Sequence, residues 1–132
     1  MFRNIPQKTH TQLRLLIVDD EPSIRTLLAQ VLTRSGYRVQ SCAGGLSALS
    51  TIRQEIPDIL LSDLNMPGMS GFELLAVVRQ RFPEIKTIAM SGAYSGNGIP
   101  AGVVADAFYA KGTNFHALTE ILDAMAVPRA RC

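Results

Sequence analysis

The chain contains a short apolar run that ends in a carboxylate and is followed by a turn-rich loop. Residues 59–62 are Ile-Leu-Leu-Ser, a pattern typical of a buried strand, and Asp63 follows them directly. Residues 65–71 then include an asparagine, a proline, two glycines and a serine, and a helix is predicted from Gly71 onward. In an open parallel sheet, ligands bind in the crevice outside the carboxyl ends of the strands. Asp63 is therefore the first candidate for a chemical role.

A second apolar run upstream has the same form. Residues 13–18 are predicted to form a strand, and Asp19, Asp20 and Glu21 follow just before a predicted helix. Acids from two strand ends could converge on one point, where a cluster of like charges is costly. A divalent cation such as Mg²⁺, which prefers carboxylate oxygens and water, would neutralise that cluster. Alternatively, Asp19 or Asp20 caps the helix that begins near Pro22, and both roles can hold at once.

Predicted strands and helices alternate along the whole chain. The strands are expected at 13–18, 37–41, 59–62, 85–90 and 107–110, and the helices at 23–35, 46–56, 71–82 and 115–125. Helical periodicity places Leu27 and Leu46 among the residues that face the core. This alternation favours an α/β fold with a parallel sheet and right-handed crossovers.

Composition and charge exclude several classes of protein. The chain is 47% hydrophobic and 18% charged, which fits a soluble globular domain. No apolar run approaches the roughly 18 residues of a membrane span, and the first residues lack a signal peptide's apolar centre, so we expect a cytoplasmic protein that does not contact membranes. Residues 15–127 hold eight basic and 11 acidic residues, so the excess of basic charge lies at the ends. Contact of these ends with an acidic partner or nucleic acid stays open, but solvated tails are favoured.

Four motifs, in order, resemble the receiver domain of two-component response regulators. They are the Asp19-Asp20 pair, the run Asp-Leu-Asn-Met-Pro-Gly-Met-Ser-Gly-Phe-Glu-Leu at 63–74, Ser91 and Lys111. The resemblance covers about residues 13–126 and implies a flavodoxin-like doubly wound sheet of five parallel strands in the order 2-1-3-4-5, with helices on both faces. We expect residues 1–12 to be a flexible arm, 13–126 the receiver domain and 127–132 a tail.

The resemblance implies a phosphoryl-transfer site. Asp63 would be the phosphoacceptor, attacking the phosphorus of a phosphohistidine on a partner kinase or of a small phosphodonor. Lys111 would pair with Asp63 and then with a phosphoryl oxygen, and Ser91 would donate its hydroxyl to another. Phe108 matches the family's switch aromatic, which moves inward as Ser91 moves toward the phosphate. By strand alternation, Tyr109 would then be the more exposed neighbour.

The resemblance also implies a Mg²⁺ site and its ligands. Asp20, Asp63 and the backbone carbonyl of Asn65 would bind the metal ion, with Asp19 acting through coordinated water. The metal and the Lys111 ammonium would then share the charge of a loose phosphoryl-transfer transition state.

Two features depart from the family pattern. Residues 92–106, where a receiver has its fourth helix, include three glycines, an asparagine and a proline within 96–102, so that helix should be short or irregular. Either the surface that reports phosphorylation is remodelled, or Ile99, Val103 and Val104 simply cover the sheet with a looser loop. Gly112 stands where the family has a cis proline after the lysine, and a trans Lys111-Gly112 bond is predicted because a cis bond before a non-proline is costly.

Two functions from different classes follow. The first is a phosphorylation-operated switch, not an enzyme, that works with a sensor histidine kinase or histidine phosphotransferase and a downstream target protein, with a homodimer left open. The domain itself is not expected to bind nucleic acid. The alternative is an adaptor with a receiver fold that binds partners without phosphate, which residues 92–106 and Gly112 favour. A metal-dependent hydrolase is a distant third, because no second aspartate follows in the Asp63-Leu-Asn run. The intact acids, Ser91 and Lys111 favour the switch.

Overall fold

The structure, a computed structural model, describes residues 13–92, 99–112 and 114–126. Its five strands form one parallel sheet in the order β2-β1-β3-β4-β5. The strands are β1 (Arg14–Val18), β2 (Arg38–Cys42), β3 (Ile59–Asp63), β4 (Lys86–Ser91) and β5 (Ala107–Ala110). The helices are α1 (Pro22–Arg34), α2 (Gly45–Gln54), α3 (Gly71–Arg81) and α4 (Phe115–Ala126). The predicted α/β fold and strand order are confirmed, and each bound lies within two residues of its predicted position.

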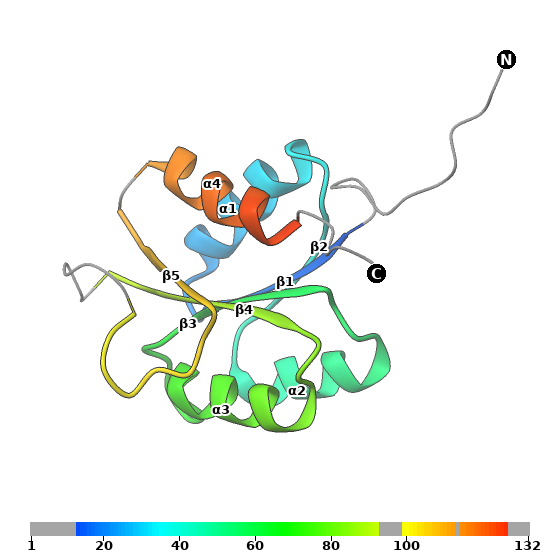
Figure 1. Ribbon diagram of the computed structural model, residues 1–132, viewed down its shortest axis with the longest axis vertical. Helices are drawn as coiled ribbons and strands as arrows, with labels where there is room; N and C mark the ends of the chain where they lie inside the picture. Colours follow the sequence, from blue (N-terminus) through cyan, green and yellow to red (C-terminus); the bar gives the residue numbers. More distant parts are fainter. Residues whose placement is uncertain (1–12, 93–98, 113, 127–132) are drawn as a thin grey trace, which may run out of the picture.

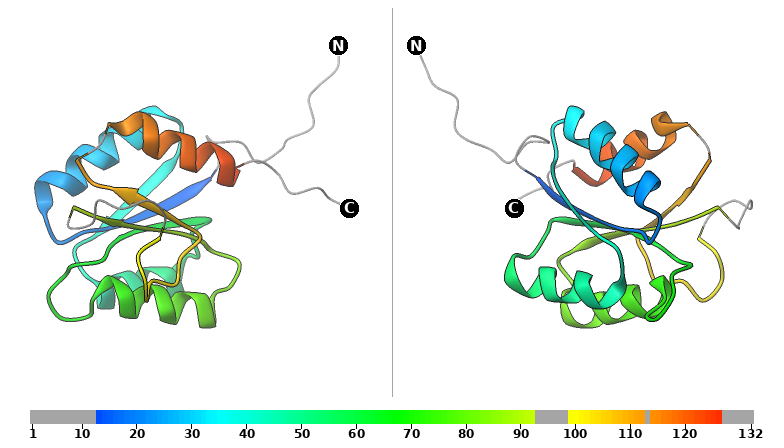
Figure 2. Two further views of the ribbon diagram at one scale, coloured as in Figure 1. Left: turned by 60° about the vertical axis from the view of Figure 1, so that its left-hand side comes forward. Right: turned by 180° about the vertical axis from the view of Figure 1, so that it is seen from behind.

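The helices cover the sheet on both sides. Figure 1 shows α1 and α4 on one face and α2 and α3 on the other, and the views in Figure 2 agree. The central strand β3 is buried along its whole length, which is why its sequence is a nearly continuous apolar run rather than an alternating one. None of the described helices is long and apolar enough to cross a bilayer.

The sheet separates two apolar clusters, to which successive strand residues contribute in turn. The cluster under α2 and α3 takes Leu16, Val18, Leu60 and Ala89 from the strands, and Ala48, Leu49, Ile52, Leu74, Leu75 and Val78 from the helices. The cluster under α1 and α4 takes Leu15, Ile17, Ile59, Leu61, Ile88, Met90 and Tyr109 from the strands, and Leu28, Leu32, Leu118 and Leu122 from the helices. Burial on both faces specifies the register of the strands.

Two residues predicted to face the core are exposed. Leu27 is 44% exposed and Leu46 is 72% exposed. In α2 the buried stripe runs through Gly45, Ala48, Leu49 and Ile52, so Leu46 lies about 100° away from its buried neighbour Gly45 around the helix. In α1 the fully buried residues are Leu28 and Leu32. Each helix buries a narrow stripe, and apolar residues beside that stripe stay in water.

The described part of the crossover between β4 and β5 contains no helix. Residues 103–105 are neither helix nor strand, while residues 93–98 lie outside the described residues. Of the three residues that would cover the sheet, Val103 packs against the cluster under α2 and α3, as does Ala105. Ile99 is 38% exposed and Val104 is 40% exposed, so the expectation is wrong for these two. The expectation that the helix between β4 and β5 is short or irregular is therefore supported over 99–106, where the chain makes a turn closed by a hydrogen bond from the Val103 N–H to the Pro100 carbonyl at 3.2 Å.

A polar contact anchors the end of this crossover. One Asp106 carboxylate oxygen accepts hydrogen bonds from the Thr87 backbone N–H at 2.8 Å and the Thr87 hydroxyl at 3.3 Å. The Asp106 N–H donates to the Thr87 carbonyl at 2.9 Å. The other carboxylate oxygen of Asp106 pairs with Arg79 of α3 at 3.1 Å. These bonds hold β5 beside β4, and so fix the point at which β5 delivers Lys111.

Candidate functional site

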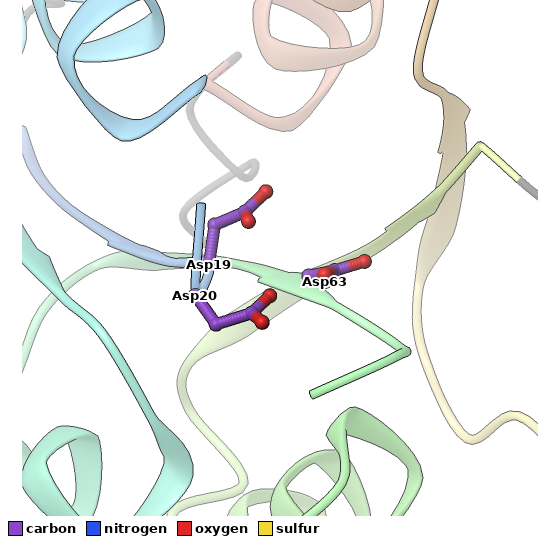
Figure 3. Close-up of side chains that lie close together, drawn as sticks. All are labelled: Asp19, Asp20 and Asp63. Atoms are coloured by element: carbon purple, nitrogen blue, oxygen red, sulfur yellow. The ribbon is translucent and has the colours of Figure 1, made fainter. Parts of the chain in front are cut away.

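Three carboxylates meet at the carboxyl end of the sheet. Asp19, Asp20 and Asp63 each offer an oxygen atom, and these atoms all lie within 4.8 Å of one another. In Figure 3, Asp19 and Asp20 leave the end of β1 and lean toward the side where Asp63 leaves the end of β3. Asp19 is fully buried and Asp63 is 4% exposed, while Asp20 is half-buried. The predicted convergence of acids from two strand ends is confirmed.

Strand register brings the other predicted site residues to the same edge. Asp63 pairs with Met90 across β3 and β4, and the Leu64 N–H donates to the Met90 carbonyl at 2.9 Å. Ser91 is the next residue of β4, and its carbonyl accepts from the Lys111 N–H at 3.0 Å. Ser91 and Lys111 therefore flank Asp63 because the three parallel strands end together.

A fixed loop connects Asp63 to α3. Ser70 caps the helix: its hydroxyl accepts from the Glu73 N–H at 3.2 Å, and the Glu73 carboxylate accepts from the Ser70 N–H at 3.0 Å. This reciprocal pair satisfies two backbone donors at the start of α3. The Gly71 N–H donates to the Leu64 carbonyl at 3.1 Å, which closes the loop. A Cβ on Gly71 would lie 2.0 Å from the Asp63 carbonyl oxygen, so only glycine fits this close approach.

Lys111 lies among the acids and forms three ion pairs. Its Nζ is 2.8 Å from Asp19 Oδ2, 3.4 Å from Asp63 Oδ1 and 3.6 Å from Glu21 Oε1. The side chain of Lys111 is only 15% exposed. The sequence predicted a Lys111–Asp63 pair; the structure contains it but places the ammonium nearer to Asp19.

Burial and charge shift the pKa values of the central pair. Burial raises the pKa of the Asp63 carboxyl, Lys111 lowers it, Asp19 raises it, and the net result lies above the ordinary value. For Lys111, burial alone lowers the pKa, but the contacts with Asp19 and Asp63 outweigh burial and leave it raised. Asp63 is thus a carboxylate whose charge is costly until a cation compensates it, while Lys111 is firmly protonated.

Asn65 links the loop after β3 to Ser91. The Asn65 side-chain amide donates to Ser91 Oγ at 3.2 Å, and its backbone N–H donates to Asp63 Oδ1 at 3.4 Å. Ser91 Oγ is the acceptor in the first bond, and a serine hydroxyl also carries one O–H donor. Sequence reasoning had assigned only the backbone carbonyl of Asn65 to the site.

None of the three acidic side chains between β1 and α1 makes a cap hydrogen bond to the helix. Glu21 occupies the N-cap position and makes no side-chain cap hydrogen bond. Asp19 Oδ1 instead accepts from the Glu21 N–H at 2.9 Å, which is a local turn before the helix. The expectation that Asp19 or Asp20 caps α1 is wrong, since the two acids lie one and two residues before the cap.

The residues around Lys111 show one confirmed prediction and one error. Among the residues that the structure describes, no peptide bond is cis, so Lys111-Gly112 is trans as predicted, and Gly112 has φ +90°, a conformation that glycine adopts without a steric penalty. Tyr109 is only 3% exposed and belongs to the cluster under α1 and α4, so the expectation of an exposed Tyr109 is wrong. Phe108 is half-buried and packs against the opposite cluster. Strand alternation puts Tyr109 on the opposite face of the sheet from Phe108, but α1 and α4 cover that face as well.

The acidic cluster suits a hard divalent cation. Asp19 Oδ2 is buried and is paired with the Lys111 ammonium at 2.8 Å. Three carboxylates with one ammonium among them leave excess negative charge in a largely buried site, and oxygen donors of this kind suit Mg²⁺. The donor set therefore fits the metal ion that the sequence suggested.

Two further residues of the site were not assigned a role from the sequence. Glu21 reaches Lys111, and the guanidinium of Arg25 donates to the Asp19 carbonyl at 2.8 Å. Glu21 stands directly after the acidic pair, which is a signal that could have included it. Arg25 lies six positions after Asp19, and only the path of the chain from β1 into α1 brings the two together.

Comparisons with known proteins agree with this geometry. Residues 15–123 match the response regulator receiver domain family. The chain is 40% identical over 78 residues to the sporulation initiation phosphotransferase F of Bacillus subtilis, a match that covers 59% of this chain and 63% of that protein. Over 75 residues it is 41% identical to the DNA-binding transcriptional regulator NtrC of Klebsiella pneumoniae, of which only 16% is covered. The matches thus span less than two thirds of these relatives.

Solved structures show the same likeness over most of the chain. The response regulator TrrA of Thermotoga maritima, crystallised in complex with Mg²⁺-BeF, superposes with a TM-score of 0.79 at 32% identity, covering 86% of this chain and 98% of that one. TrrA in complex with the histidine kinase ThkA superposes with a TM-score of 0.80 at 33% identity, covering 87% and 99%. Fold, acidic edge and family match coincide over the same residues. The chain belongs to the response regulator receiver domain family, the signalling domain of two-component phosphorelays.

Proposed function

We propose that this receiver accepts a phosphoryl group on Asp63 and changes conformation in response. One observation carries the proposal: the Asp63 carboxylate lies at a buried strand end within 4.8 Å of two further carboxylates, and 3.4 Å from Lys111. Burial raises the pKa of Asp63, which means that its ionised carboxylate is destabilised unless a nearby cation compensates the charge. Phosphorylation adds further negative charge at the same point, and the Lys111 ammonium is close enough to compensate part of it.

The proposed step is a displacement at phosphorus. A carboxylate oxygen of Asp63 attacks the phosphorus of a phosphohistidine, and a P–O bond forms as the P–N bond to the imidazole breaks. The electron pair of the P–N bond returns to the imidazole nitrogen, which takes up a proton from water if it needs one to become neutral. The products are an acyl phosphate on Asp63 and an unmodified histidine. A small phosphodonor such as acetyl phosphate gives the same acyl phosphate and releases acetate.

Lys111 and Ser91 bind the transferred group. The ammonium already lies between Asp19 and Asp63, so a short movement along the site brings it to a phosphoryl oxygen. The Ser91 hydroxyl accepts from Asn65 and directs its own proton to a second oxygen. Charge-assisted contacts of this kind stabilise the negative charge of a loose phosphoryl-transfer transition state.

We assign the metal site to Asp20, Asp63 and the backbone carbonyl of Asn65, with Asp19 acting through water. Bound Mg²⁺ would supply a positive charge that compensates the carboxylates and the phosphoryl oxygens. Asp19 is engaged directly by Lys111 and by the Glu21 N–H, which supports an outer role for it rather than direct coordination.

Conformational change is assigned to Ser91 and Phe108. Ser91 is fully buried at the end of β4, and Phe108 is a half-buried residue on β5, the strand paired with β4. A movement of Ser91 toward the phosphoryl group leaves space that the Phe108 ring can enter, and the balance between two packings then reports phosphorylation. We place this switch in a domain of residues 13–126, with the segments before and after it as an arm and a tail.

The proposed partners are a sensor histidine kinase or histidine phosphotransferase and a downstream target protein. Support comes from the relatives: one structural neighbour was crystallised with a histidine kinase, and one curated relative is itself a sporulation phosphotransferase. The histidine-borne phosphoryl group of such a partner is the donor that the Asp63 site requires.

The test is intact-mass spectrometry after incubation with acetyl phosphate and Mg²⁺. We expect one added phosphoryl group in the native chain and in Asp58→Asn, and none in Asp63→Asn or with EDTA. Asp58 is the matched control because it precedes the same strand at the opposite end, where it accepts from the Arg14 N–H. No adduct on the native chain, together with no binding of a beryllofluoride mimic, would reject the proposal in favour of a phosphate-independent adaptor.

A further inference from the structure

Arg25 lies beside a cluster of acids but donates to a backbone carbonyl rather than to a carboxylate. It lies in α1 and is half-buried, and its Nη1 donates to the backbone carbonyl of Asp19 at 2.8 Å. Arg14 and Arg79 form ion pairs with carboxylates, whereas Arg25 forms none with any part of the chain that the structure describes. Its guanidinium therefore serves a backbone carbonyl rather than a side-chain charge.

The carbonyl that Arg25 holds belongs to the peptide bond between Asp19 and Asp20. The Asp19 N–H is already bonded to the Cys42 carbonyl at 3.1 Å, and the Glu21 N–H is bonded to Asp19 Oδ1. Across residues 13–92, 99–112 and 114–126, Arg25 is the one donor to this carbonyl. Because the peptide unit is planar, the direction of its carbonyl also fixes the direction in which the Cα of Asp20 leaves it.

The position of the Asp20 carboxylate depends on the backbone conformation more than the positions of the Asp19 and Asp63 carboxylates do. Asp19 is held by Lys111 and the Glu21 N–H, and Asp63 by Lys111 and the Asn65 N–H. The side chain of Asp20 has no hydrogen bond or ion pair to any described residue, yet its carboxylate takes part in the acidic cluster. Its place in the cluster follows from the orientation of the peptide that precedes it.

We infer that Arg25 is a positioning residue for the metal site: its guanidinium fixes the Asp19-Asp20 peptide so that the Asp20 carboxylate faces Asp63. This inference rests on the metal site of the proposed function. Loss of the contact frees the peptide to rotate, and Asp20 then spends part of its time outside the cluster. Removing residues that orient metal ligands typically weakens metal binding 10- to 100-fold.

When Arg25 is removed, the loss of its positioning contact and the loss of its positive charge should change the Mg²⁺ affinity in opposite directions. Arg25 is a cation next to the acids, so deleting its charge should by itself strengthen Mg²⁺ binding. Loss of positioning should weaken it. Arg34 is the matched control, because it lies on the same helix and lines the same surface hollow as Arg25, and no described contact joins it to the acids. Arg34→Ala therefore reports the effect of one cation lost from α1 without loss of the carbonyl contact.

The experiment measures the Kd for Mg²⁺ by calorimetry, with no phosphodonor present. For Arg25→Ala we expect binding about 10-fold weaker than wild type, for Arg34→Ala unchanged or slightly tighter binding, and for Arg25→Gln, which keeps an N–H donor, partial recovery. In the metal-free protein, Arg25→Ala should also shift the backbone NMR signals of Asp20 and Glu21. Equal or tighter binding by Arg25→Ala, or no recovery in Arg25→Gln, would overturn the inference, as would absence of Mg²⁺ binding by the wild type.

The two proposals fail separately. A wild type that binds Mg²⁺ but is never phosphorylated would reject the phosphoryl-transfer proposal and leave the role of Arg25 standing. If the wild type is phosphorylated but Arg25→Ala leaves the Mg²⁺ affinity unchanged, the role of Arg25 is rejected and the phosphoryl-transfer proposal stands. Thermal melts of each variant, run without metal, separate a loss of affinity from a loss of folded protein.

Discussion

Gly71→Ala should damage the site far more than the stability of the domain. A Cβ at position 71 would lie 2.0 Å from the Asp63 carbonyl oxygen and 2.6 Å from the Leu64 Cα, and both are backbone atoms of the loop that follows the phosphoacceptor. Real Cβ contacts are essentially never shorter than 3.0 Å, so the backbone has to move by about 1.0 Å. The atoms that must move are those of Asp63 itself and its neighbour.

The expected magnitudes follow from that displacement. Overpacking of this kind costs about 1 to 3 kcal/mol, which for a domain of this size lowers Tm by roughly 3 to 5 °C per kcal/mol. A misplacement of about 1 Å at a reacting group can lower a rate about 100-fold. We therefore expect a folded variant whose phosphorylation by acetyl phosphate, followed by intact mass at a temperature well below its Tm, is slower by about two orders of magnitude.

Gly44→Ala provides the control for this substitution. A Cβ on Gly44 meets nothing within 4 Å, although Gly44 also stands at the start of a helix. This variant should retain nearly wild-type phosphorylation and lose about 1 kcal/mol of stability or less. If Gly71→Ala were phosphorylated at the wild-type rate, the close approach of α3 to the Asp63 backbone would have no part in placing the carboxylate, and the reasoning would be refuted.

Three further predictions concern stability. Burial raises the pKa of Asp63 in the folded protein above its ordinary value of 3.8, so ionisation of Asp63 at higher pH destabilises the fold. In the absence of metal, Asp63→Asn should therefore raise Tm little near pH 3.5 and by more as the pH approaches neutrality. A gain in Tm that does not grow with pH would contradict this. Asp106→Ala should lower the free energy of unfolding in urea by about 1 to 3 kcal/mol, because the Thr87 N–H loses its acceptor. Arg79→Ala removes only an exposed ion pair with Asp106 and should lower it by under about 1 kcal/mol. Equal losses in the two variants would be inconsistent with the Asp106–Thr87 contact. Leu49→Ala should cost about 2 to 5 kcal/mol and Leu46→Ala far less, because Leu46 is 72% exposed, and similar Tm losses would show that exposure to be wrong.

Much of the site was predictable because strand ends are predictable. Apolar runs that stop at Asp19 and Asp63 mark where β1 and β3 leave the core, and a parallel sheet brings such ends to one edge. Ser91 and Lys111 were assigned to the site by the resemblance to the receiver family, and the structure has both at the same edge. Position along the sheet is thus encoded locally, in the length of each apolar run.

Contacts across the site were not predictable in the same way. Whether Lys111 lies nearer to Asp19 or Asp63 depends on the balance of several charges at similar distances. The Arg25 contact depends on the angle at which α1 leaves β1, which no spacing in the sequence specifies. Alternation correctly put Phe108 and Tyr109 on opposite faces, but it could not tell that both faces of β5 are covered.

The location of the phosphoryl group decides whether Asp63 is the phosphoacceptor. After incubation with acetyl phosphate and Mg²⁺, borohydride reduces an acyl phosphate on aspartate to homoserine, which peptide mass spectrometry assigns to a residue. We expect the reduced residue to be Asp63, with Asp19 and Asp20 unchanged. Reduction at either of those residues, or at no residue in a sample that carries the added mass, would contradict it.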